Sequence, residues 1–346
     1  MEESLTCEHP ERKILMKAAY IEETGPPEVI QYGDIPTPEP GEGQVLVKIG
    51  TAALNPIDTY VRNGANYWEL PKPFVTGSDL AGTIEKMGPG TSRYQVGQRV
   101  WGTNQGLVGR QGTFAEYAVV DEHWLYATPD DVKDDAVAAC ALTGITAHLG
   151  LGADNAALKS GETIFVHGGS GGVGSMVVQM AKAMGATVLT TAGSREKSEI
   201  CLELGADHVF NYKTQDVDEE VLKVCPNGVN VIWETIREPD FDFLVSIAAE
   251  RCRMVLMAGR DARPEFPVGP FYVKGCSLHG FVMFKASPEE MAVSGNEISR
   301  WLSEGKLKPQ IGKIFPLSEA AAAHKLQEDN TLRQAGTLVG KILIKP

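Results

Sequence analysis

The sequence predicts an α/β fold that combines a doubly wound parallel-sheet domain with a compact, mostly β domain, and two observations lead to this class. From about residue 134 onward, apolar runs of strand length alternate with segments of helical periodicity, a pattern typical of parallel sheets with helices on both faces. Residues 16–130 instead hold short apolar–polar runs separated by glycines, which is typical of a small β domain.

A glycine-rich turn at residues 169–174 is the centre of the predicted parallel sheet. An apolar run at 164–166 precedes it, helical spacing follows it as far as Gly185, and a second strand is expected at 187–191. This G-x-G-x-x-G pattern between a strand and a helix is typical of dinucleotide binding, because its glycines allow a tight turn, a close approach to a pyrophosphate and close helix packing. Cofactor contacts are therefore predicted for Gly169, Ser170, Gly171, Gly172, Val173 and Gly174. The alternative is a close-packed structural turn in another α/β domain.

The residues after the second expected strand favour NADPH over NADH. An NAD site places Asp or Glu at this strand end to hold the ribose hydroxyls, and none stands here. Ser194, Arg195 and Lys197 follow instead, and cationic donors suit the 2′-phosphate of NADPH. The alternative for Arg195 and Lys197 is an ordinary solvated first turn of a helix.

Composition excludes several classes of function. The net charge of −13 argues against binding to nucleic acids or to anionic membranes, and no segment is long and apolar enough to span a bilayer. Residues 1–15 are polar and lack the apolar core of a signal peptide, so we interpret them as a flexible extension. The six cysteines form no C-x-x-C pair, which favours reduced thiols and a cytoplasmic location.

Further elements are expected along the chain. The patterns predict strands at 114–119 and 277–283 and helices at 134–150 and 241–249. After residue 289 the alternation ends, and helices at 289–304 and 318–328 precede a terminal strand at 340–344.

Several short motifs occur in one order along the chain, at residues 55–60, 77–82, 97–100, 112–117 and 141–147, followed by the glycine-rich turn. Together they resemble the zinc-independent quinone oxidoreductases, the zeta-crystallin group of the medium-chain dehydrogenase/reductase superfamily. The resemblance covers the chain from about Met16 to its end. It implies a GroES-like catalytic domain at 16–138, an NADPH-binding Rossmann domain at 139–285, and a segment at 286–346 that returns to the catalytic domain.

The resemblance also implies a protein without a metal. Zinc-dependent relatives have Cys where Asn55 stands and a His-Glu pair where Ser78 and Asp79 stand. Cys140 lies near the region of the third ligand, but one thiolate does not make a zinc site. Without a Lewis acid, the protein suits an acceptor that takes hydride readily.

By resemblance, Asn55, Asp58 and Tyr60 line the cleft between the domains near the nicotinamide. Asn55 and Tyr60 can donate hydrogen bonds to the acceptor oxygen that gains charge, Asp58 holds the local network, and Tyr67 is a second candidate donor. The alternatives are that Asn55 and Pro56 form a turn and that Tyr60 is a half-buried structural residue.

Further cofactor contacts are implied by the resemblance. Thr143 and Thr146 match positions that approach the nicotinamide half, although both also fit simple packing in an Ala-rich helix. Lys197 and Tyr212 match positions at the 2′-phosphate, with Ser194 as a partner. Arg260 follows the glycine that ends a strand and is a candidate for a cofactor phosphate.

These features predict an NADPH-dependent quinone reductase. The main rival reduces α,β-unsaturated carbonyls or enoyl thioesters, which also requires a proton donor to carbon. A third hypothesis, a non-catalytic structural or binding protein, follows from members of the superfamily that serve as lens crystallins or bind RNA. A homodimer formed through the edge strand at 277–283 is expected, with a homotetramer as the alternative.

Overall fold

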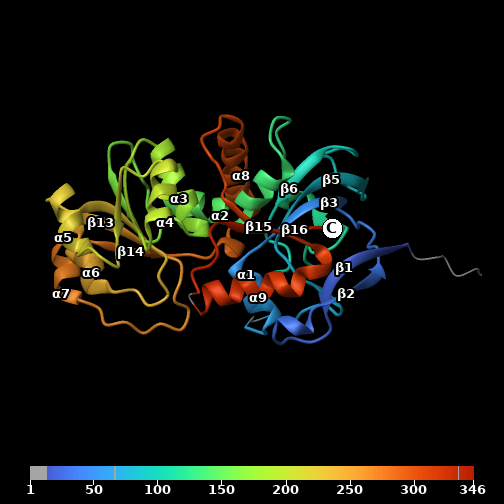
Figure 1. Cartoon of the computed structure of the whole chain (residues 1–346). Helices are drawn as coiled ribbons and strands as arrows, with labels where there is room; N and C mark the ends of the chain where they lie inside the picture. Colours follow the sequence, from blue (N-terminus) through green and yellow to red (C-terminus); the bar gives the residue numbers. More distant parts are fainter. Residues whose placement is uncertain (1–13, 66–67, 334) are drawn as a thin grey trace, which may run out of the picture.

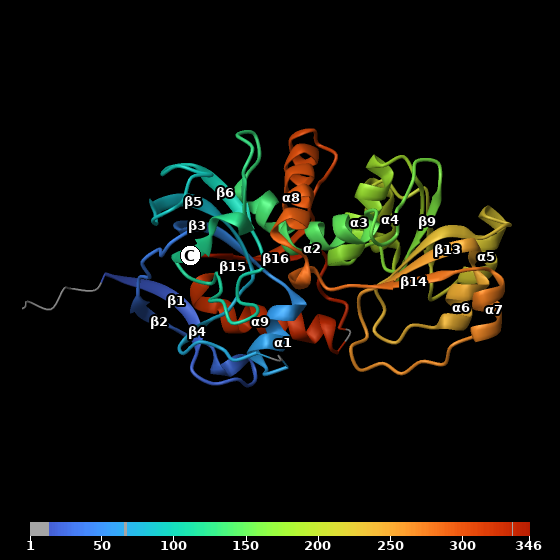
Figure 2. The same ribbon diagram turned by 180° about the vertical axis from the view of Figure 1, so that it is seen from behind.

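The computed structural model describes residues 14–65, 68–333 and 335–346. The chain forms two lobes, and helices α2 (Asp134–Leu151) and α8 (Pro288–Ser303) lie between them (Figures 1 and 2). One lobe is built on mostly antiparallel strands and the other on a six-stranded parallel sheet. This arrangement confirms the predicted fold class.

The first lobe contains a three-stranded sheet in the order β2-β1-β4 and a seven-stranded sheet in the order β15-β16-β3-β5-β6-β8, in which β7 pairs with β3. Its strands are β1 (Leu15–Ile21), β2 (Gln31–Pro36), β3 (Gln44–Leu54), β4 (Phe74–Val75), β5 (Asp79–Met87), β6 (Arg99–Gly102), β7 (Tyr117–Asp121), β8 (Leu125–Ala127), β15 (Ile311–Pro316) and β16 (Lys341–Lys345). The final strand β16 pairs antiparallel with β3, with Ile342 opposite Leu54. The domain boundaries at residues 138 and 285 stay a prediction. Residues 1–13 of the proposed extension lie outside the described residues.

The second lobe contains a parallel sheet in the order β11-β10-β9-β12-β13-β14. Its strands are β9 (Thr163–Val166), β10 (Thr187–Ala192), β11 (His208–Asn211), β12 (Val229–Glu234), β13 (Ala248–Leu256) and β14 (Ser277–Gly280). The strand order reverses between β9 and β12. Ligands of such sheets bind outside the carboxyl ends of the strands at this reversal, and the glycine-rich turn follows β9 at that edge.

The other helices cover the sheets and connect their strands. They are α1 (Pro56–Arg62), α3 (Gly172–Ala183), α4 (Arg195–Glu203), α5 (Val217–Val224), α6 (Phe241–Ser246), α7 (Val268–Val273) and α9 (Ala320–Thr331), with short 3₁₀ turns at Pro27–Val29, Glu122–Trp124, Met283–Lys285 and Leu317–Glu319. Within the described parts of the chain, no helix has both the length and the apolar character needed to cross a membrane.

The core explains why the last three residues of β9 are apolar. Ile164 and Val166 belong to a large cluster that also includes Ile145 of α2, whereas Phe165 packs into a second cluster with Ile232. Both faces of the parallel sheet are therefore buried, as expected for parallel strands between helical layers.

The sheet shifts three expected boundaries. Helix α6 ends at Ser246 instead of 249, because Ala248 already pairs with Val229 in the parallel sheet. Strand β14 ends at Gly280, three residues earlier than expected, and β7 begins at Tyr117. Strands β2, β4, β8 and β15 and helices α1 and α7 were not predicted.

Candidate cofactor and acceptor site

The glycine-rich turn joins β9 to α3, and two of its glycines are required by packing. A Cβ atom on Gly169 would lie 2.3 Å from Thr190 Oγ1, and one on Gly174 would lie 2.2 Å from the carbonyl oxygen of Gly168. Both contacts are closer than side chains tolerate, so glycine allows strand, turn and helix to pack against one another.

The other two glycines of the turn have more room, although a Cβ on Gly171 would lie 3.2 Å from the Gly168 carbonyl oxygen. Gly171 and Gly172 are exposed, and a Cβ on Gly172 would meet only Thr143 Cγ2 at 3.5 Å. The first hydrogen bond into α3 runs from the Ser175 N–H to the Gly171 carbonyl, so the preceding N–H groups at the helix start have no partner within the helix. The residues present therefore fit the pyrophosphate of a dinucleotide, which helix N-termini bind readily.

The residues after β10 form a small polar group. Ser194 is the N-cap of α4, and its hydroxyl accepts a hydrogen bond from the Lys197 N–H at 3.3 Å. The Tyr212 ring packs over Gly193, where a Cβ would lie 2.3 Å from Tyr212 Oη. Ser194 therefore lies between Gly193, which Tyr212 covers, and the first turn of α4, which bears Lys197. Tyr212 is about half exposed.

Arg195 has a different environment from its neighbours. Its guanidinium pairs with Glu199 at 2.9 Å on the outer surface of α4, and the side chain is 92% exposed. The Arg195 charge is therefore already paired, at a solvent-exposed position.

Thr143 lies on α2 beside the glycine-rich turn and is buried. Its hydroxyl donates to the Ala139 carbonyl at 3.3 Å, one turn back in the same helix, and Thr146 does the same to Leu142 at 2.8 Å. The Thr143 methyl group thus lies beside the glycine-rich turn, while its hydroxyl is used within the helix.

Asn55 and Asp58 belong to a buried network at the start of α1. The Asn55 backbone N–H donates to Asp58 Oδ2 at 2.7 Å, and the Ser78 hydroxyl donates to Asp58 Oδ1 at 2.6 Å. Asn55 Nδ2 donates to Asp79 Oδ2 at 2.7 Å. The donors of the fully buried Asn55 amide are therefore directed into the protein, away from the role of hydrogen-bond donor to an acceptor that the sequence predicts.

One cation lies inside this network. Lys341 Nζ donates to the Leu54 carbonyl at 2.8 Å and to Asn55 Oδ1, and it lies 3.8 Å from Asp79 Oδ2. Burial raises the pKa of Asp58 to about 7, and burial also raises the pKa of Asp79 and lowers the pKa of Lys341.

Tyr60 lies where the two lobes face each other. The Arg237 guanidinium, from the loop after β12, lies 5.9 Å from the centroid of the Tyr60 ring. Burial raises the pKa of Tyr60, so its hydroxyl stays protonated and able to donate at neutral pH. Tyr67, the second predicted donor, lies outside the described residues.

Arg260 also reaches from the parallel-sheet lobe to the other lobe. Its Nη1 donates to the Ala65 carbonyl at 2.6 Å, in the segment after α1. The sequence predicts a cofactor contact for Arg260, and the structure places its guanidinium at the facing segment of the first lobe.

Comparisons with known proteins agree with this architecture. Residues 41–130 match the family model for the alcohol dehydrogenase GroES-like domain, and residues 172–298 match the model for zinc-binding dehydrogenase. The chain is 32% identical to human quinone oxidoreductase over 332 residues, which cover 95% of this chain and 98% of the human protein. The chain belongs to the quinone oxidoreductase family of the medium-chain dehydrogenase/reductase superfamily.

Two further comparisons concern function. A 2-haloacrylate reductase from Burkholderia is 29% identical, with 90% of this chain and 95% of that protein covered. A mycobacterial structure in complex with NADPH superimposes with a TM-score of 0.82 at 30% identity and covers 96% of this chain and 100% of its own. As a member of this superfamily, the chain is an oxidoreductase.

One of the two matching family models describes a zinc-binding dehydrogenase, which raises the question of a metal site in this chain. Within residues 14–65, 68–333 and 335–346, no group of three or more His, Cys, Asp or Glu side chains could hold a metal ion. The Cys140 thiol contacts Met176 Sδ at 3.7 Å in the core. Independence from zinc stays a prediction for this family member.

Sequence reasoning missed a polar pair at the strand reversal. His167 directly follows β9, and its Nδ1 lies 2.8 Å from Glu234 Oε2 at the end of β12. Glu234 is buried and also accepts from the Ile236 N–H at 2.5 Å. The sequence signal was a polar residue directly after each of two apolar runs. The roles of Asp79 and Lys341 had no such local signal.

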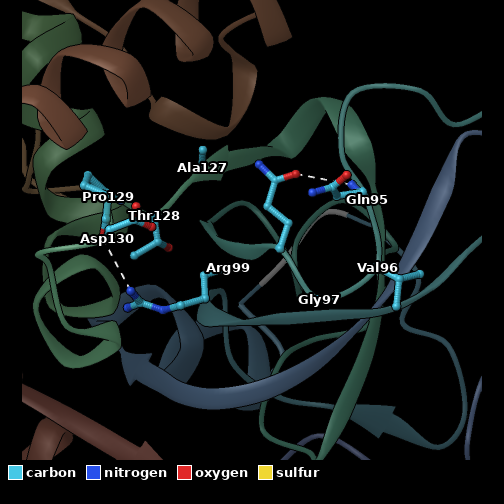
Figure 3. A pocket seen from close by; sticks show the side chains of 9 residues that line it. Gln95, Val96, Gly97, Arg99, Ala127, Thr128, Pro129 and Asp130 are labelled. Atoms are coloured by element: carbon cyan, nitrogen blue, oxygen red, sulfur yellow. Dashed lines mark hydrogen bonds between the residues drawn. The ribbon is translucent and has the colours of Figure 1, made fainter.

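A surface hollow of about 560 Å³ lies elsewhere on the first lobe (Figure 3). It is lined by Gln95, Val96, Gly97, Gln98, Arg99, Ala127, Thr128, Pro129 and Asp130. The Arg99 guanidinium at its edge is bonded to the Val132 carbonyl and to Asp134, both at 2.6 Å. This hollow contains none of the predicted site residues, so we assign it no part in the reaction.

Proposed function

We propose that this protein is an NADPH-dependent reductase of quinones and that its reaction takes place between the two lobes. The observation that supports this most directly is the glycine-rich turn, with its exposed glycines and the N–H groups at the start of α3. The next strand, β10, ends without an acid and is followed by Ser194 and Lys197. The similarity along almost the whole chain to human quinone oxidoreductase and to a mycobacterial structure in complex with NADPH supports the same proposal.

The cofactor half of the site would use residues of the parallel-sheet lobe. The turn at residues 169–174 binds the pyrophosphate through the N–H groups at the start of α3, because the Gly169 and Gly171 N–H groups already donate to the Thr191 and Gly168 carbonyls. Ser194, Lys197 and Tyr212 bind the 2′-phosphate. Arg195 adds positive potential at the surface, and Thr143 packs beside the turn. When bound here, NADPH supplies the hydride.

The acceptor half would use residues around α1. The Tyr60 hydroxyl donates a hydrogen bond to the acceptor oxygen as it gains charge. Arg237 and Arg260 add positive potential near Tyr60 and Ala65, where the two lobes face each other. Asn55 and Asp58 hold the start of α1 and so place Tyr60. Tyr67 is proposed as a second donor from the sequence. A reduced quinone can take its protons from water.

NADPH oxidation, followed at 340 nm with 1,4-benzoquinone and with a larger quinone, tests this proposal. NADH serves as the parallel donor and an enone as the parallel acceptor. Turnover of quinone with NADPH well above turnover with NADH supports the proposal. Absence of quinone turnover by protein that binds NADPH contradicts it.

A second candidate is reduction of an activated alkene, such as an α,β-unsaturated carbonyl or an enoyl thioester. The similarity to a 2-haloacrylate reductase favours it, and so does Arg237 beside Tyr60, since a guanidinium suits a carboxylate acceptor. Tyr60 would then also have to protonate carbon. Turnover of the enone or of an acrylate in the same assay, without quinone turnover, identifies this function.

Several related proposals concern the chain outside the reaction. We propose that it works without a protein-bound metal, because the Lys341 ammonium lies between Asn55 and Asp79 and would repel a cation there. We also propose the domain division at residues 138 and 285, a homodimer and a cytoplasmic location.

If the protein were purely structural, its intrinsic fluorescence would not respond to NADPH.

A further inference from the structure

Lys341 is a buried cation that the proposed reaction does not use directly. It is the first residue of β16, and only 7% of it is exposed. A buried ammonium is costly unless it is paired and hydrogen-bonded. Here it bonds to the Leu54 carbonyl and Asn55 Oδ1 and pairs with Asp79. Three partners in one site indicate a specific role for the charge.

Asp79 links this cation to helix α2. Its Oδ1 accepts from the Thr103 hydroxyl at 2.6 Å and from the Leu142 N–H at 3.1 Å. Leu142 directly precedes Thr143, which packs against the glycine-rich turn. The Lys341–Asp79 pair therefore connects the end of the chain to the helix beside the predicted cofactor.

Asn55 links the same cation to helix α1. The Asn55 amide accepts from Lys341 and donates to Asp79, so its orientation is fixed from both sides. The Asn55 backbone N–H bonds to Asp58 in the first turn of α1, and Tyr60 on the same helix faces Arg237 of the other lobe. A displacement of Asn55 would therefore move the helix that bears Tyr60.

We propose that Lys341 is a positioning residue for hydride transfer, which holds α1 and α2 in register through Asn55 and Asp79 without touching the acceptor. The proposal rests on the proposed function, since it assumes a reaction between these helices. β16 is well placed for this role, because it lies beside β3, whose last residue precedes Asn55 (Figure 1).

Lys341→Met is the direct test, because it keeps the length of the side chain and removes the charge. We expect kcat to fall by about 10²-fold, the scale of a 1 Å misplacement, while KM for the acceptor and Kd for NADPH change far less. Lys345→Met is the matched control. Lys345 lies on the same strand but pairs with Asp135 at the partly exposed start of α2, away from Asn55 and Asp79, so its loss should leave kcat near the wild-type value.

A double variant separates positioning from folding. Lys341→Met alone leaves Asp79 as an unpaired buried carboxylate, which destabilises the fold. Asp79→Asn combined with Lys341→Met removes both charges, so we expect the melting temperature to recover while kcat stays low. Recovery of kcat together with the melting temperature would overturn the proposal, and so would a wild-type kcat in Lys341→Met.

Amide hydrogen exchange tests the same inference without turnover. Faster exchange at residues 55–62 and 140–144 in Lys341→Met, but not in Lys345→Met, supports the positioning role. Unchanged exchange in these segments contradicts it. If wild-type protein reduces neither quinones nor enones, the proposed function fails, and the exchange experiment still decides the role of Lys341.

Discussion

Lys197 is the residue on which the choice between NADPH and NADH is expected to depend. It lies in the first turn of α4, where its backbone N–H donates to the Ser194 cap. A charge-assisted hydrogen bond contributes roughly 1.5–3 kcal/mol, so Lys197→Ala should weaken NADPH binding by about 10–100-fold. NADH lacks the phosphate, so its affinity should not change. Fluorescence titration with both nucleotides measures the difference.

Two further variants make the Lys197 test specific. Lys223→Ala removes an exposed lysine on α5 that pairs with Glu220 and should bind NADPH as the wild type does. Arg195→Ala should have a smaller effect than Lys197→Ala, because Arg195 pairs with Glu199. Equal losses for NADPH and NADH in Lys197→Ala would show that Lys197 does not contact the 2′-phosphate.

Asp58 should make stability depend on pH in the direction opposite to that of a salt-bridged carboxylate. Burial raises its pKa from 3.8 to about 7, so between these pH values the folded chain holds a proton that the unfolded chain has released. The free energy of unfolding therefore falls as pH rises through this range, by at most about 1.4 kcal/mol per pH unit. Burial also raises the pKa of Asp79, which therefore contributes to the slope in the same direction, whereas the lowered pKa of Lys341 contributes in the opposite direction.

Asp58→Asn tests this pH dependence, because an amide imitates the protonated acid. It keeps an acceptor for the Asn55 N–H and can donate to the Ser78 hydroxyl. Urea unfolding between about pH 4.5 and pH 7.5 should show a flatter dependence for the variant than for the wild type. Asp261→Asn, at a side chain that is 90% exposed, is the control. An unchanged slope in Asp58→Asn would contradict the assignment.

At the scale of elements, glycine-to-alanine substitutions in the glycine-rich turn can distinguish an effect on packing from an effect on cofactor binding. Gly174→Ala places a Cβ 2.2 Å from the Gly168 carbonyl oxygen, so it should lower stability by about 1–3 kcal/mol through overpacking. Gly171 has an ordinary φ of −74° and is exposed. A Cβ on Gly171 would lie 3.2 Å from the Gly168 carbonyl oxygen, which a small shift relieves, so Gly171→Ala should lose far less stability than Gly174→Ala and bind NADPH more weakly. Melting temperature and fluorescence titration measure the two effects, and unimpaired NADPH binding by Gly171→Ala would place the pyrophosphate elsewhere.

Elements with a local signal could be predicted from the sequence. Strand β9, the turn and α3 follow from an apolar run, four glycines and helical spacing, all within adjacent residues. Helix α1 was missed because Asn55 followed by Pro56 fits a turn as well as a helix start, where Pro is favoured in the first position. Ala248 and Ala249 were placed in a helix because alanine favours helices, but pairing with β12 places them in β13.

At the scale of the whole molecule, the site could be predicted only in part because its partners come from distant segments. Lys341 and Asn55 are 286 residues apart in the sequence, and no spacing rule brings them together. The inward orientation of the Asn55 amide depends on this contact, so the sequence alone predicted a donor to the acceptor. Arg237 and Arg260 likewise meet α1 and Ala65 only after the lobes have formed.

The outer edge of the parallel sheet presents a surface that a second copy of the chain would cover. Strand β14 pairs with β13 on one side only and ends the sheet, and α7 lies at the same end of the lobe (Figure 2). Leu278 and Val282 are about two-fifths exposed, and Tyr272 and Val273 on α7 are more than two-thirds exposed. An apolar, unpaired edge favours association with another strand.

We therefore predict a homodimer through β14, measured as twice the mass of one chain by light scattering after gel filtration. Leu278→Lys combined with Val282→Lys should convert the dimer to monomers, because two buried like charges from each chain would face each other without partners. Val293→Lys, at an apolar residue on α8 that is 64% exposed, should leave the dimer intact. A monomeric wild type contradicts the prediction, and so does a dimer that both lysines leave unchanged. Four times the chain mass, reduced to two by these lysines, would identify the tetramer and assign one of its interfaces to this edge.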